Sequence, residues 1–412
     1  MNRPADTGPV VVILVENLSV PFDRRVWQEA CTLRDAGYRV HVICPRSAES
    51  PASRELLDGI AIYRYRPGYE ARRARGYAVE YSLALASMFL LLLRIARRDR
   101  IDIIHVCNPP DLLFVPAIPF LFSKRTRLIF DQHDACPELM MAKGRDERST
   151  AVKVTRLCER ATYWLANVVI SPNESYRSLA IDRGKKRLED VFVVRSGPQV
   201  DRFAGAVPSR RFHFDHPFLA AYVGVMGIQD GVDYLLDAVD VVVNSLGRRD
   251  IQFTLAGSGP EYARLCERAK SMKLEDHVRF LGRVSESDLG ELLVSADVCV
   301  NPDEFNRMND ISTMNKVVEY MAVAKPIVQF DLKEGRVSAE EASEYVAPND
   351  STALAKAICA LIDDPQRRDQ MGQFGRDRLK NHLSWDHQEK SLLSAYARAA
   401  SGRLIDPELP AE

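Results

Sequence analysis

The chain has 412 residues, of which 46% are hydrophobic and 27% are charged, and its formal net charge at pH 7 is −1. This length predicts two globular domains, and the composition excludes a collagen, a disordered tail protein and a small disulfide scaffold. Basic residues outnumber acidic ones in residues 1–205, whereas acidic residues outnumber basic ones in the remainder. This asymmetry favours an anionic partner, such as a membrane surface or a phosphate-bearing substrate, for the first half.

No uncharged apolar run reaches 18 residues, so we expect no transmembrane helix. The segment 1–7 lacks the apolar stretch of a signal peptide. The eight cysteines have no metal-ligand spacing, and several lie in apolar stretches. These features predict reduced core cysteines in a cytoplasmic protein.

The first half alternates predicted strands and helices. A β-branched strand over 10–15 is followed by a helix over 23–36, with Asp23 as N-cap and Gly37 after its end, and by a strand over 39–44. This is a βαβ unit, which implies a parallel sheet covered by helices. The further predicted elements are a strand over 101–106, a helix over 111–122, a strand over 128–132, a helix over 153–166, and strands over 168–171 and 191–194.

The second half repeats this alternation after an irregular stretch over 205–217 that contains Pro208 and Pro217. Its predicted strands are 219–223, 252–256, 278–281, 298–301 and 326–330, and its predicted helices are 231–245, 261–272, 287–295, 314–323 and 385–399. We therefore expect two doubly wound α/β domains, over 1–205 and 206–384, followed by a final helix and tail over 385–412. Ligands of such domains usually bind at the carboxyl ends of the strands, so a cleft between the two domains is expected.

Two segments of the second half carry candidate binding chemistry. Gly257-Ser258-Gly259-Pro260-Glu261 follows a predicted strand and opens a helix. Its glycines allow the backbone to approach a phosphate or a base, although a simple tight turn needs the same residues.

The second segment is the helix over 314–323. Asp310 or Ser312 is expected to cap this helix, which would leave free N–H groups for a diphosphate. Lys316 and Glu319 share one helix face, where Lys316 can pair with phosphate and Glu319 can hold sugar or ribose hydroxyls. The alternative is an ion pair between these two residues on the surface.

Taken together, the motifs resemble the family-four retaining glycosyltransferases, which have the GT-B fold. The resemblance is carried by Asp131-Gln132-His133-Asp134, Gly257-Ser258-Gly259-Pro260-Glu261, Val278-Arg279-Phe280-Leu281-Gly282, Val318-Glu319-Tyr320-Met321-Ala322-Val323-Ala324-Lys325-Pro326 and Ser384-Trp385. It implies that the C-terminal half binds a nucleotide sugar and the N-terminal half an acceptor. It also implies that the last helix crosses back to the first domain, and that neither a metal nor a cofactor is needed.

The resemblance also implies roles for individual residues. His133, Lys316 and Glu319 are the expected catalytic residues, with His133 facing the donor sugar; the alternative for His133 is a structural residue that caps the next segment. The expected donor-binding residues are Gly227, Gly257, Gly259, Glu261, Arg283, Val284, Asp310, Ser312, Thr313 and Asn315. The expected acceptor-binding residues are Arg24, Arg25, Asn108 and Glu138.

Three positions depart from the family pattern. Ile311, with Asp310 beside it, stands where the family has the first of two glutamates, and Glu319 matches the second. The loop 224–231 lacks the usual Arg and Lys, and the loop 17–25 lacks the usual glycines. The chain thus resembles an offshoot in which Lys-x-x-Glu-Tyr replaces the paired glutamates, and whether Lys316 compensates for the missing basic pair stays open.

The apolar segment 83–93 is too short to span a bilayer. A core helix is one interpretation, and peripheral attachment to an anionic membrane is the other, because basic residues can each add roughly 1 kcal/mol of attraction to such a surface. The basic residues on either side are Arg64, Arg66, Arg72, Arg73, Arg75, Arg94, Arg97, Arg98 and Arg100.

The resemblance therefore implies a retaining, metal-independent hexosyltransferase in the cytoplasm, with peripheral attachment to the inner face of a membrane as the open alternative. It would move a sugar from a nucleoside diphosphate sugar, expected to be a UDP-sugar, to a lipid-linked or oligosaccharide acceptor in cell-surface polysaccharide or glycoconjugate synthesis. No nucleic-acid partner is expected, because no reading motif accompanies the basic residues. The alternatives are a GT-B sugar-nucleotide epimerase and a non-catalytic GT-B partner subunit.

Overall fold

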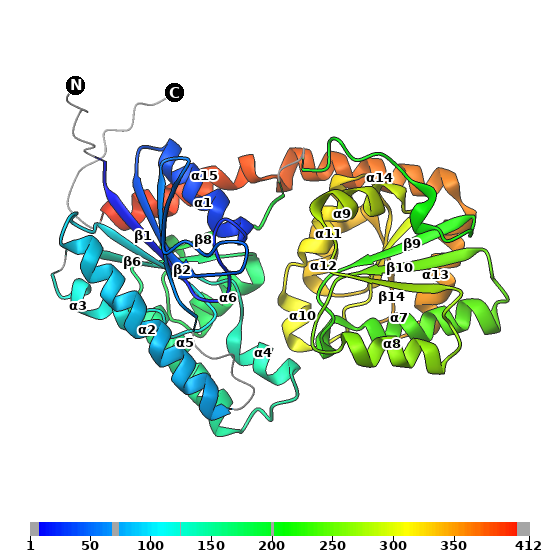
Figure 1. The fold of residues 1–412 in the computed structure, drawn as a ribbon, viewed down its shortest axis with the longest axis horizontal. Coiled ribbons are helices and arrows are strands. Elements are labelled where there is room, and N and C mark those ends of the chain that lie inside the picture. Colours follow the sequence, from blue (N-terminus) through cyan, green and yellow to red (C-terminus); the bar gives the residue numbers. More distant parts are fainter. Residues whose placement is uncertain (1–7, 68–73, 124, 199–201, 402–412) are drawn as a thin grey trace. The chain divides into compact units, whose positions relative to one another are not determined.

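The computed structural model describes residues 8–67, 74–123, 125–198 and 202–401. The chain divides into two compact units (Figure 1). The N-terminal unit comprises Met1–Met141, Arg145–Ser196 and Gln388–Glu412, and the C-terminal unit comprises Ala142–Gly144 and Gly197–His387.

The change from the N-terminal to the C-terminal unit lies between Ser196 and Gly197, before the expected boundary at 205. The packing of the following residues explains the difference. Phe203 is buried in a hydrophobic cluster with Leu292 and Leu293 of the C-terminal unit. A Cβ at Gly197 would lie 2.3 Å from the carbonyl oxygen of Leu383 in the same unit. The chain after Ser196 is therefore already part of the second core.

The N-terminal unit is built on an eight-stranded sheet with the order β3-β4-β2-β1-β5-β6-β7-β8. Its strands are β1 (Val10–Val15), β2 (Arg39–Pro45), β3 (Arg54–Leu57), β4 (Ile60–Tyr65), β5 (Ile103–Cys107), β6 (Arg127–Asp131), β7 (Val168–Ser171) and β8 (Val191–Val193). All neighbouring strands are parallel except β3 and β4, which form an antiparallel hairpin. Every residue of the central strand β1 is buried, as expected for a strand covered on both faces.

Helices α1 (Arg24–Asp35), α2 (Ala74–Ala96), α3 (Ile118–Leu121), α4 (Cys136–Ala142), α5 (Thr150–Leu165), α6 (Glu174–Asp182) and α15 (Trp385–Ser401) accompany this sheet. The predicted ends of α1 are confirmed: the Asp23 side chain accepts a hydrogen bond from the Val26 N–H, and Gly37 has a positive φ of 89°. The helix predicted over 111–122 is wrong. Pro116 and Pro119 lack N–H groups, and the segment forms only a 3₁₀ turn (Val115–Ala117) followed by the short α3.

The C-terminal unit is built on a six-stranded sheet, in which every pair is parallel, with the order β11-β10-β9-β12-β13-β14. Its strands are β9 (Phe218–Val223), β10 (Ile251–Ala256), β11 (Val278–Gly282), β12 (Val298–Asn301), β13 (Ile327–Phe330) and β14 (Ser343–Val346). Its α-helices are α7 (Val232–Asp240), α8 (Tyr262–Ser271), α9 (Glu286–Ser295), α10 (Arg307–Ile311), α11 (Asn315–Ala322), α12 (Lys333–Ala339), α13 (Ser351–Asp363) and α14 (Pro365–Arg378). Two π-turns, Val241–Ser245 and Leu379–Leu383, extend α7 and α14.

The expected cap of the helix that carries Lys316 is wrong. Asn306 starts a separate short helix, α10, by accepting a hydrogen bond from the Asn309 N–H. Asp310 therefore lies inside α10, and the Ser312 hydroxyl donates to the Met308 carbonyl oxygen at 2.7 Å. Helix α11 begins at Asn315, and its N-cap residue Met314 makes no side-chain cap.

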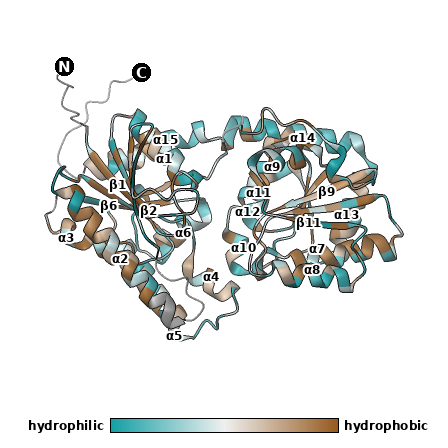
Figure 2. Ribbon diagram, in the orientation of Figure 1, coloured by the Kyte–Doolittle hydropathy of each residue, from teal (hydrophilic) through white to brown (hydrophobic). Residues whose placement is uncertain are grey.

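Helix α2 is longer than the predicted segment 83–93. In the described residues, Val79–Ala96 is long and apolar enough to cross a membrane by length and composition, with a mean hydropathy of 1.7. The sequence-based exclusion missed it because charged residues interrupt the apolar run. Figure 2 shows most of this helix in the hydrophobic colour.

The two faces of α2 differ. One face belongs to the core of the N-terminal unit through Ala84, Met88, Leu92 and Ile95. Elsewhere on the helix Val79, Leu83 and Leu90 are 61%, 53% and 64% exposed. The core-helix interpretation therefore accounts for only one side of α2.

Candidate active site

The first group of candidate residues lies at the carboxyl ends of the strands in the C-terminal unit. The loop 224–231 leaves β9, and the glycine-containing turn 257–261 leaves the adjacent β10. Backbone hydrogen bonds join them: the Met226 N–H donates to Ser258 O at 3.1 Å, and the Glu261 N–H donates to Met226 O at 2.9 Å. The Gly257 N–H donates to Gly282 O at the end of β11, so three strand ends meet here.

The glycines of this turn are required by that close packing. Gly257 has a φ of 142°, and a Cβ on it would lie 1.8 Å from the Gly224 carbonyl oxygen. A Cβ on Gly259 would lie 2.4 Å from the Met226 carbonyl oxygen. The close packing of the two loops thus requires glycine at both positions, whether or not a ligand binds there.

Lys316 lies beside the same loop, and it is buried. A Cβ on Gly224 would be 3.1 Å from Lys316 Cε, and the ammonium lies over the Tyr222 ring, 5.1 Å from its centroid. The ammonium is 2.7 Å from Asp303 Oδ1 and 4.0 Å from Asp230 Oδ1. Asp303 and Asp230 therefore lie beside the expected site residue Lys316. The sequence did not indicate either carboxylate.

Burial perturbs these groups. It raises the pKa of Asp230 to about 6 and also raises the pKa of Asp303. For Lys316, burial lowers the pKa, but the charges of Asp303 and Asp230 outweigh it and raise the pKa overall. Lys316 is therefore a cation, and Asp303 is its closest counter-ion.

Glu319 has a different partner. Its carboxylate pairs with Arg202, which also pairs with Glu286 at the start of α9. Lys316 thus pairs with Asp303, and Glu319 pairs with Arg202. These contacts replace the surface ion pair between Lys316 and Glu319 that was the alternative. Arg202 was missed because it lies in a stretch with no motif, next to the predicted linker.

The other expected donor-binding residues are dispersed around this edge. Glu261 is the N-cap residue of α8 and pairs with Arg264. Arg283 and Val284 follow the end of β11, and Gly227 donates its N–H to Asp230 Oδ2 at 2.9 Å. Thr313 lies in the short stretch between α10 and α11, whereas Asp310 accepts a hydrogen bond from the Lys333 N–H at the start of α12.

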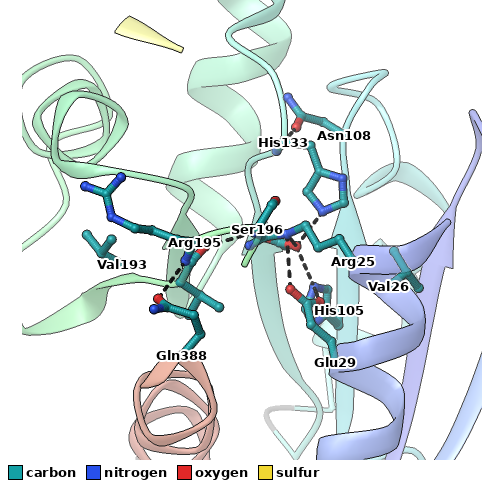
Figure 3. Close-up of polar contacts among 12 residues, drawn as sticks. Arg25, Val26, Glu29, His105, Asn108, His133, Val193, Arg195, Ser196 and Gln388 are labelled. Carbon is teal, nitrogen blue, oxygen red and sulfur yellow. Dashed lines mark hydrogen bonds and ion pairs between the residues drawn. The ribbon is translucent and has the colours of Figure 1, made fainter. Parts of the chain in front are cut away.

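The second group of candidate residues lies in the N-terminal unit. Figure 3 shows Arg25 and Glu29 of α1 close to His105 of β5 and to His133, which follows β6. The guanidinium of Arg25 holds both oxygens of the buried Asp131, with distances of 2.7 Å from Nη2 to Oδ1 and 3.0 Å from Nε to Oδ2. The Nε2 atom of His133 is 2.5 Å from Asp131 Oδ2.

A second carboxyl group and a second imidazole complete this cluster. Glu29 Oε1 is 3.1 Å from Arg25 Nε, and His105 Nε2 is 3.6 Å from both Glu29 Oε2 and Asp131 Oδ2. His105 Nδ1 is 2.6 Å from the hydroxyl of Tyr396 on α15. The cluster therefore joins α1, β5, β6 and the last helix.

The protonation states in this cluster follow from burial and charge. Burial raises the pKa of Asp131, but Arg25 outweighs it, so that the pKa lies well below its usual range. Burial and the charge of Asp131 raise the pKa of Glu29 well above its usual range. Burial lowers the pKa of His105. Asp131 is thus ionised, whereas Glu29 and His105 are neutral.

One combination of side chains in the described residues has the composition of a metal site. The ligand atoms of His105, Cys107 and Asp131 lie within 4.8 Å of one another. Because the Arg25 guanidinium already holds both oxygens of Asp131, a cation would have to displace or adjoin a buried positive charge. The geometry favours an ion-pair cluster over a metal centre.

The expected acceptor-binding residues occupy different environments. Arg24 is exposed, whereas Arg25 is buried and also donates to Val194 O at 2.8 Å and Ser196 Oγ at 3.1 Å. Asn108 accepts hydrogen bonds from the backbone N–H groups of His133 and Asp134, and it donates to Asp111. Glu138 is buried and pairs with Arg183 through two contacts of 2.8 and 3.1 Å. Asn108 therefore fixes the loop that contains His133, and Glu138 fixes helix α4 to Arg183.

Comparison with known families covers both units. Residues 23–197 match the family described as "Glycosyl transferase 4-like domain". Residues 217–364 match the family described as "Glycosyl transferases group 1". The two matches follow one another along the chain and together span most of it.

Individual relatives are distant. The chain is 22% identical to a glycogen synthase of Mycobacterium tuberculosis over 94% of this chain and 93% of the relative. It is 27% identical to a phosphatidyl-myo-inositol mannosyltransferase of Mycobacterium leprae, over 52% of this chain and 54% of that protein. Among solved structures, HepE of Anabaena in complex with UDP and glucose superimposes with a TM-score of 0.72 at 14% identity, over 94% of this chain and 99% of the other. The structural similarity to HepE confirms the GT-B fold.

Proposed function

Because the chain belongs to the GT4-like glycosyltransferases of group 1, we propose that it moves a hexosyl group from a UDP-sugar to a lipid-linked or oligosaccharide acceptor with retention of configuration. The observation that carries this proposal is the buried Lys316 at the edge where the glycine turn 257–261 meets the loop 224–231. A cation beside closely packed backbone suits the diphosphate of an activated sugar. The structural neighbour HepE was solved with UDP and glucose, which supports a UDP-sugar donor.

In this proposal, the C-terminal unit binds the donor. Lys316 offsets the negative charge that develops on the departing diphosphate, and the first turn of α11, which no side chain caps, supplies backbone N–H donors. Glu319 holds a hydroxyl of the ribose or of the sugar, and the backbone around Arg283 and Val284 meets the base. The reaction uses no metal, because Lys316 and the backbone donors supply the positive charge.

The N-terminal unit supplies His133 and the acceptor site. His133 makes a hydrogen bond to a hydroxyl of the transferred sugar or of the acceptor. Arg24 is exposed and contacts the acceptor, Asn108 fixes the loop that contains His133, and Glu138 fixes α4 to Arg183. The product enters cell-surface polysaccharide or glycoconjugate synthesis at the cytoplasmic face of a membrane.

A transfer assay tests the proposal. The protein is incubated with a panel of UDP- and GDP-sugars and with membrane lipid extract or oligosaccharides, without added metal and with EDTA. We expect release of UDP that depends on acceptor, and NMR of the product should show the anomeric configuration of the donor. An inverted product, or turnover that requires a divalent cation, contradicts the mechanism.

The two alternatives are not favoured, and the same assay separates them from the proposal. An epimerase converts the UDP-sugar without acceptor and yields no transferred sugar. A non-catalytic subunit releases no UDP under any of these conditions. The relatives reported above are named as a synthase and a transferase, in line with sugar transfer.

We also propose that the N-terminal unit attaches to an anionic membrane through α2. Phe89 of α2 packs edge-to-face against Phe120 of α3, and Phe122 beyond α3 is 81% exposed. The exposed residues Val79, Leu83 and Leu90 lie on one face of α2 by helical spacing, and Phe122 is a further exposed apolar residue of the same unit. Arg94, Arg97 and Arg98 are exposed at the end of α2, where they suit anionic headgroups. The mannosyltransferase relative is named for a lipid acceptor, phosphatidyl-myo-inositol.

One of the arginines expected to contribute is not available. Arg64 is buried, donates to the Val20 carbonyl oxygen at 2.6 Å and pairs with Glu55. Its place on β4, inside the sheet, accounts for this. Arg72 and Arg73 lie outside the described residues.

Cosedimentation with vesicles tests the membrane proposal. We expect the protein to bind vesicles that contain phosphatidylglycerol more tightly than neutral vesicles, and Leu83→Glu with Leu90→Glu should weaken this binding at least tenfold. Leu56→Glu is the matched control, because Leu56 is an exposed leucine on β3. Equal sedimentation of the α2 variant and the control would overturn the proposal.

A further inference from the structure

We propose that Asp131 is a positioning residue that fixes the tautomer and orientation of His133, so that Nδ1 of His133 accepts a hydrogen bond from a substrate hydroxyl. The inference rests on the proposed function, since it assumes that His133 meets a substrate. Asp131 acts on the reaction only through His133, and Nδ1 is the ring nitrogen of His133 that contacts the substrate.

A short hydrogen bond joins Asp131 and His133. The His133 Nε2 atom lies 2.5 Å from Asp131 Oδ2. An ionised carboxylate is only an acceptor, so the ring must donate through an Nε2–H group. In a neutral imidazole this leaves Nδ1 as the acceptor.

Asp131 is held in its charged form by a dedicated partner. The Arg25 guanidinium donates to both of its oxygens, and both side chains are buried. Arg25 is itself fixed by Val194 O and Ser196 Oγ. The carboxylate therefore cannot turn away from His133 without breaking a two-point contact.

The backbone of His133 is fixed as well. Figure 3 shows Asn108 beside His133. Asn108 Oδ1 accepts hydrogen bonds from the N–H groups of His133 and Asp134, at 2.7 and 3.1 Å. With both the backbone and Nε2 anchored, the imidazole has one orientation. A side chain that contacts a reacting sugar needs to be preorganised in this way.

The second carboxyl group of the cluster does not compete for this role. Glu29 Oε1 lies 3.1 Å from Arg25 Nε, but neither oxygen of Glu29 meets hydrogen-bond geometry, although its carboxyl group is completely buried. An uncharged Glu29 leaves Asp131 as the single anion that faces Arg25, His105 and His133. The pairing of Arg25 with Asp131 therefore keeps the buried cluster neutral overall.

The first test reads the tautomer directly and needs no activity. Nitrogen-15 NMR of the histidine side chains is recorded above pH 7.5, with His133 assigned from the His133→Gln spectrum. We expect His133 of the unchanged protein to show a protonated Nε2 and an unprotonated Nδ1. A protonated Nδ1, or rapid exchange between both forms, overturns the proposal.

The second test measures coupling in the transfer reaction. In Asp131→Asn, Oδ1 of the new amide faces Arg25 and its NH₂ group faces His133, which forces the Nδ1–H tautomer. If His133 contributes a factor of roughly 10²–10⁴, as positioned acid–base groups do, Asp131→Asn should lower kcat at least tenfold with little change in KM. The double variant Asp131→Asn/His133→Ala should lose no more than His133→Ala alone. If the double variant instead loses kcat by the product of the two single losses, the proposal is overturned.

Asp190→Asn is the matched control, because Asp190 is another buried aspartate of the same unit that is paired with arginines, Arg187 and Arg398. A similar fall in kcat in this control would show a general effect of lost ion pairs and overturn the assigned role. If no variant, including the unchanged protein, transfers sugar, the proposed function fails, whereas the NMR result still decides the tautomer.

Discussion

Arg25 of the N-terminal unit and Lys316 of the C-terminal unit are buried basic side chains that carboxylates from other segments neutralise. Arg25 is held by Asp131, and Lys316 by Asp303 and Asp230. Removing one partner of such a pair is costly because it leaves an uncompensated buried charge. The sequence pattern indicated Lys316 and Arg25, but it could not indicate their partners, because the fold alone brings residue 25 to residue 131 and residue 316 to residues 230 and 303.

Glu29 gives a prediction about stability and pH. Its pKa is near 4.5 when exposed and lies well above this in the folded protein. Above about pH 4.5 the folded state therefore binds a proton that the unfolded state has lost, and the free energy of unfolding falls as the pH rises. Glu29→Gln copies the neutral acid and removes this fall.

Urea denaturation at pH 5, 6, 7 and 8 measures the effect. We expect Glu29→Gln to gain stability relative to the unchanged protein as the pH increases. Glu174→Gln serves as the control, since Glu174 is exposed at the start of α6. A constant difference between Glu29→Gln and the unchanged protein would mean that Glu29 is already ionised in the fold.

Asp230 gives a prediction about donor binding and pH. Burial raises its pKa to about 6, and its Oδ1 atom lies 4.0 Å from the Lys316 ammonium. Ionisation above pH 6 places a negative charge beside the proposed diphosphate. The affinity for UDP-glucose, whose esterified phosphates keep a constant charge, should therefore fall about tenfold between pH 5 and pH 8.

Calorimetry at both pH values tests this. Asp230→Asn should bind UDP-glucose with nearly the same affinity at pH 5 and pH 8. If this variant keeps the pH dependence of the unchanged protein, another group is responsible.

At the scale of elements, the site is shaped by where helices and turns begin. The sequence predicted one helix with a polar cap before Lys316, whereas Asn306 starts α10 and leaves Ser312 and Thr313 in a separate short stretch before α11. The glycine turn was recognised from its sequence. Its tight contact with Gly224 and Met226 could not be, because that contact depends on the lateral order of β9 and β10.

Gly257 gives a prediction at this scale. Gly257→Ala puts a Cβ within 1.8 Å of a backbone oxygen at a φ of 142°. We expect a loss of at least about 2–3 kcal/mol of stability, and weaker UDP binding, since both loops must separate.

Gly205→Ala is the control, because a Cβ there has nothing within 4 Å. Thermal unfolding and UDP titration of both variants provide the comparison. Equal behaviour of the two variants would show that the turn tolerates rearrangement.

At the scale of the whole molecule, the alternation of strands and helices predicted two doubly wound units. The limits of β1, β7 and β12 match the prediction residue for residue. The hairpin of β3 and β4 was missed, since its strands are short and β3 contains no buried residue. The first boundary was placed too late, because Phe203 packs into the second core although the sequence around it resembles a linker.

The most direct measurement for the account as a whole is calorimetric titration of UDP into three proteins: the unchanged chain, Asp303→Asn, and Asp303→Asn with Lys316→Met. The account predicts one UDP site per chain. It also predicts tighter binding in Asp303→Asn, where Lys316 is released from its closest carboxylate, and binding at least tenfold weaker in the double variant than in the single one. No UDP binding by the unchanged chain, or equal affinity in all three proteins, would contradict it.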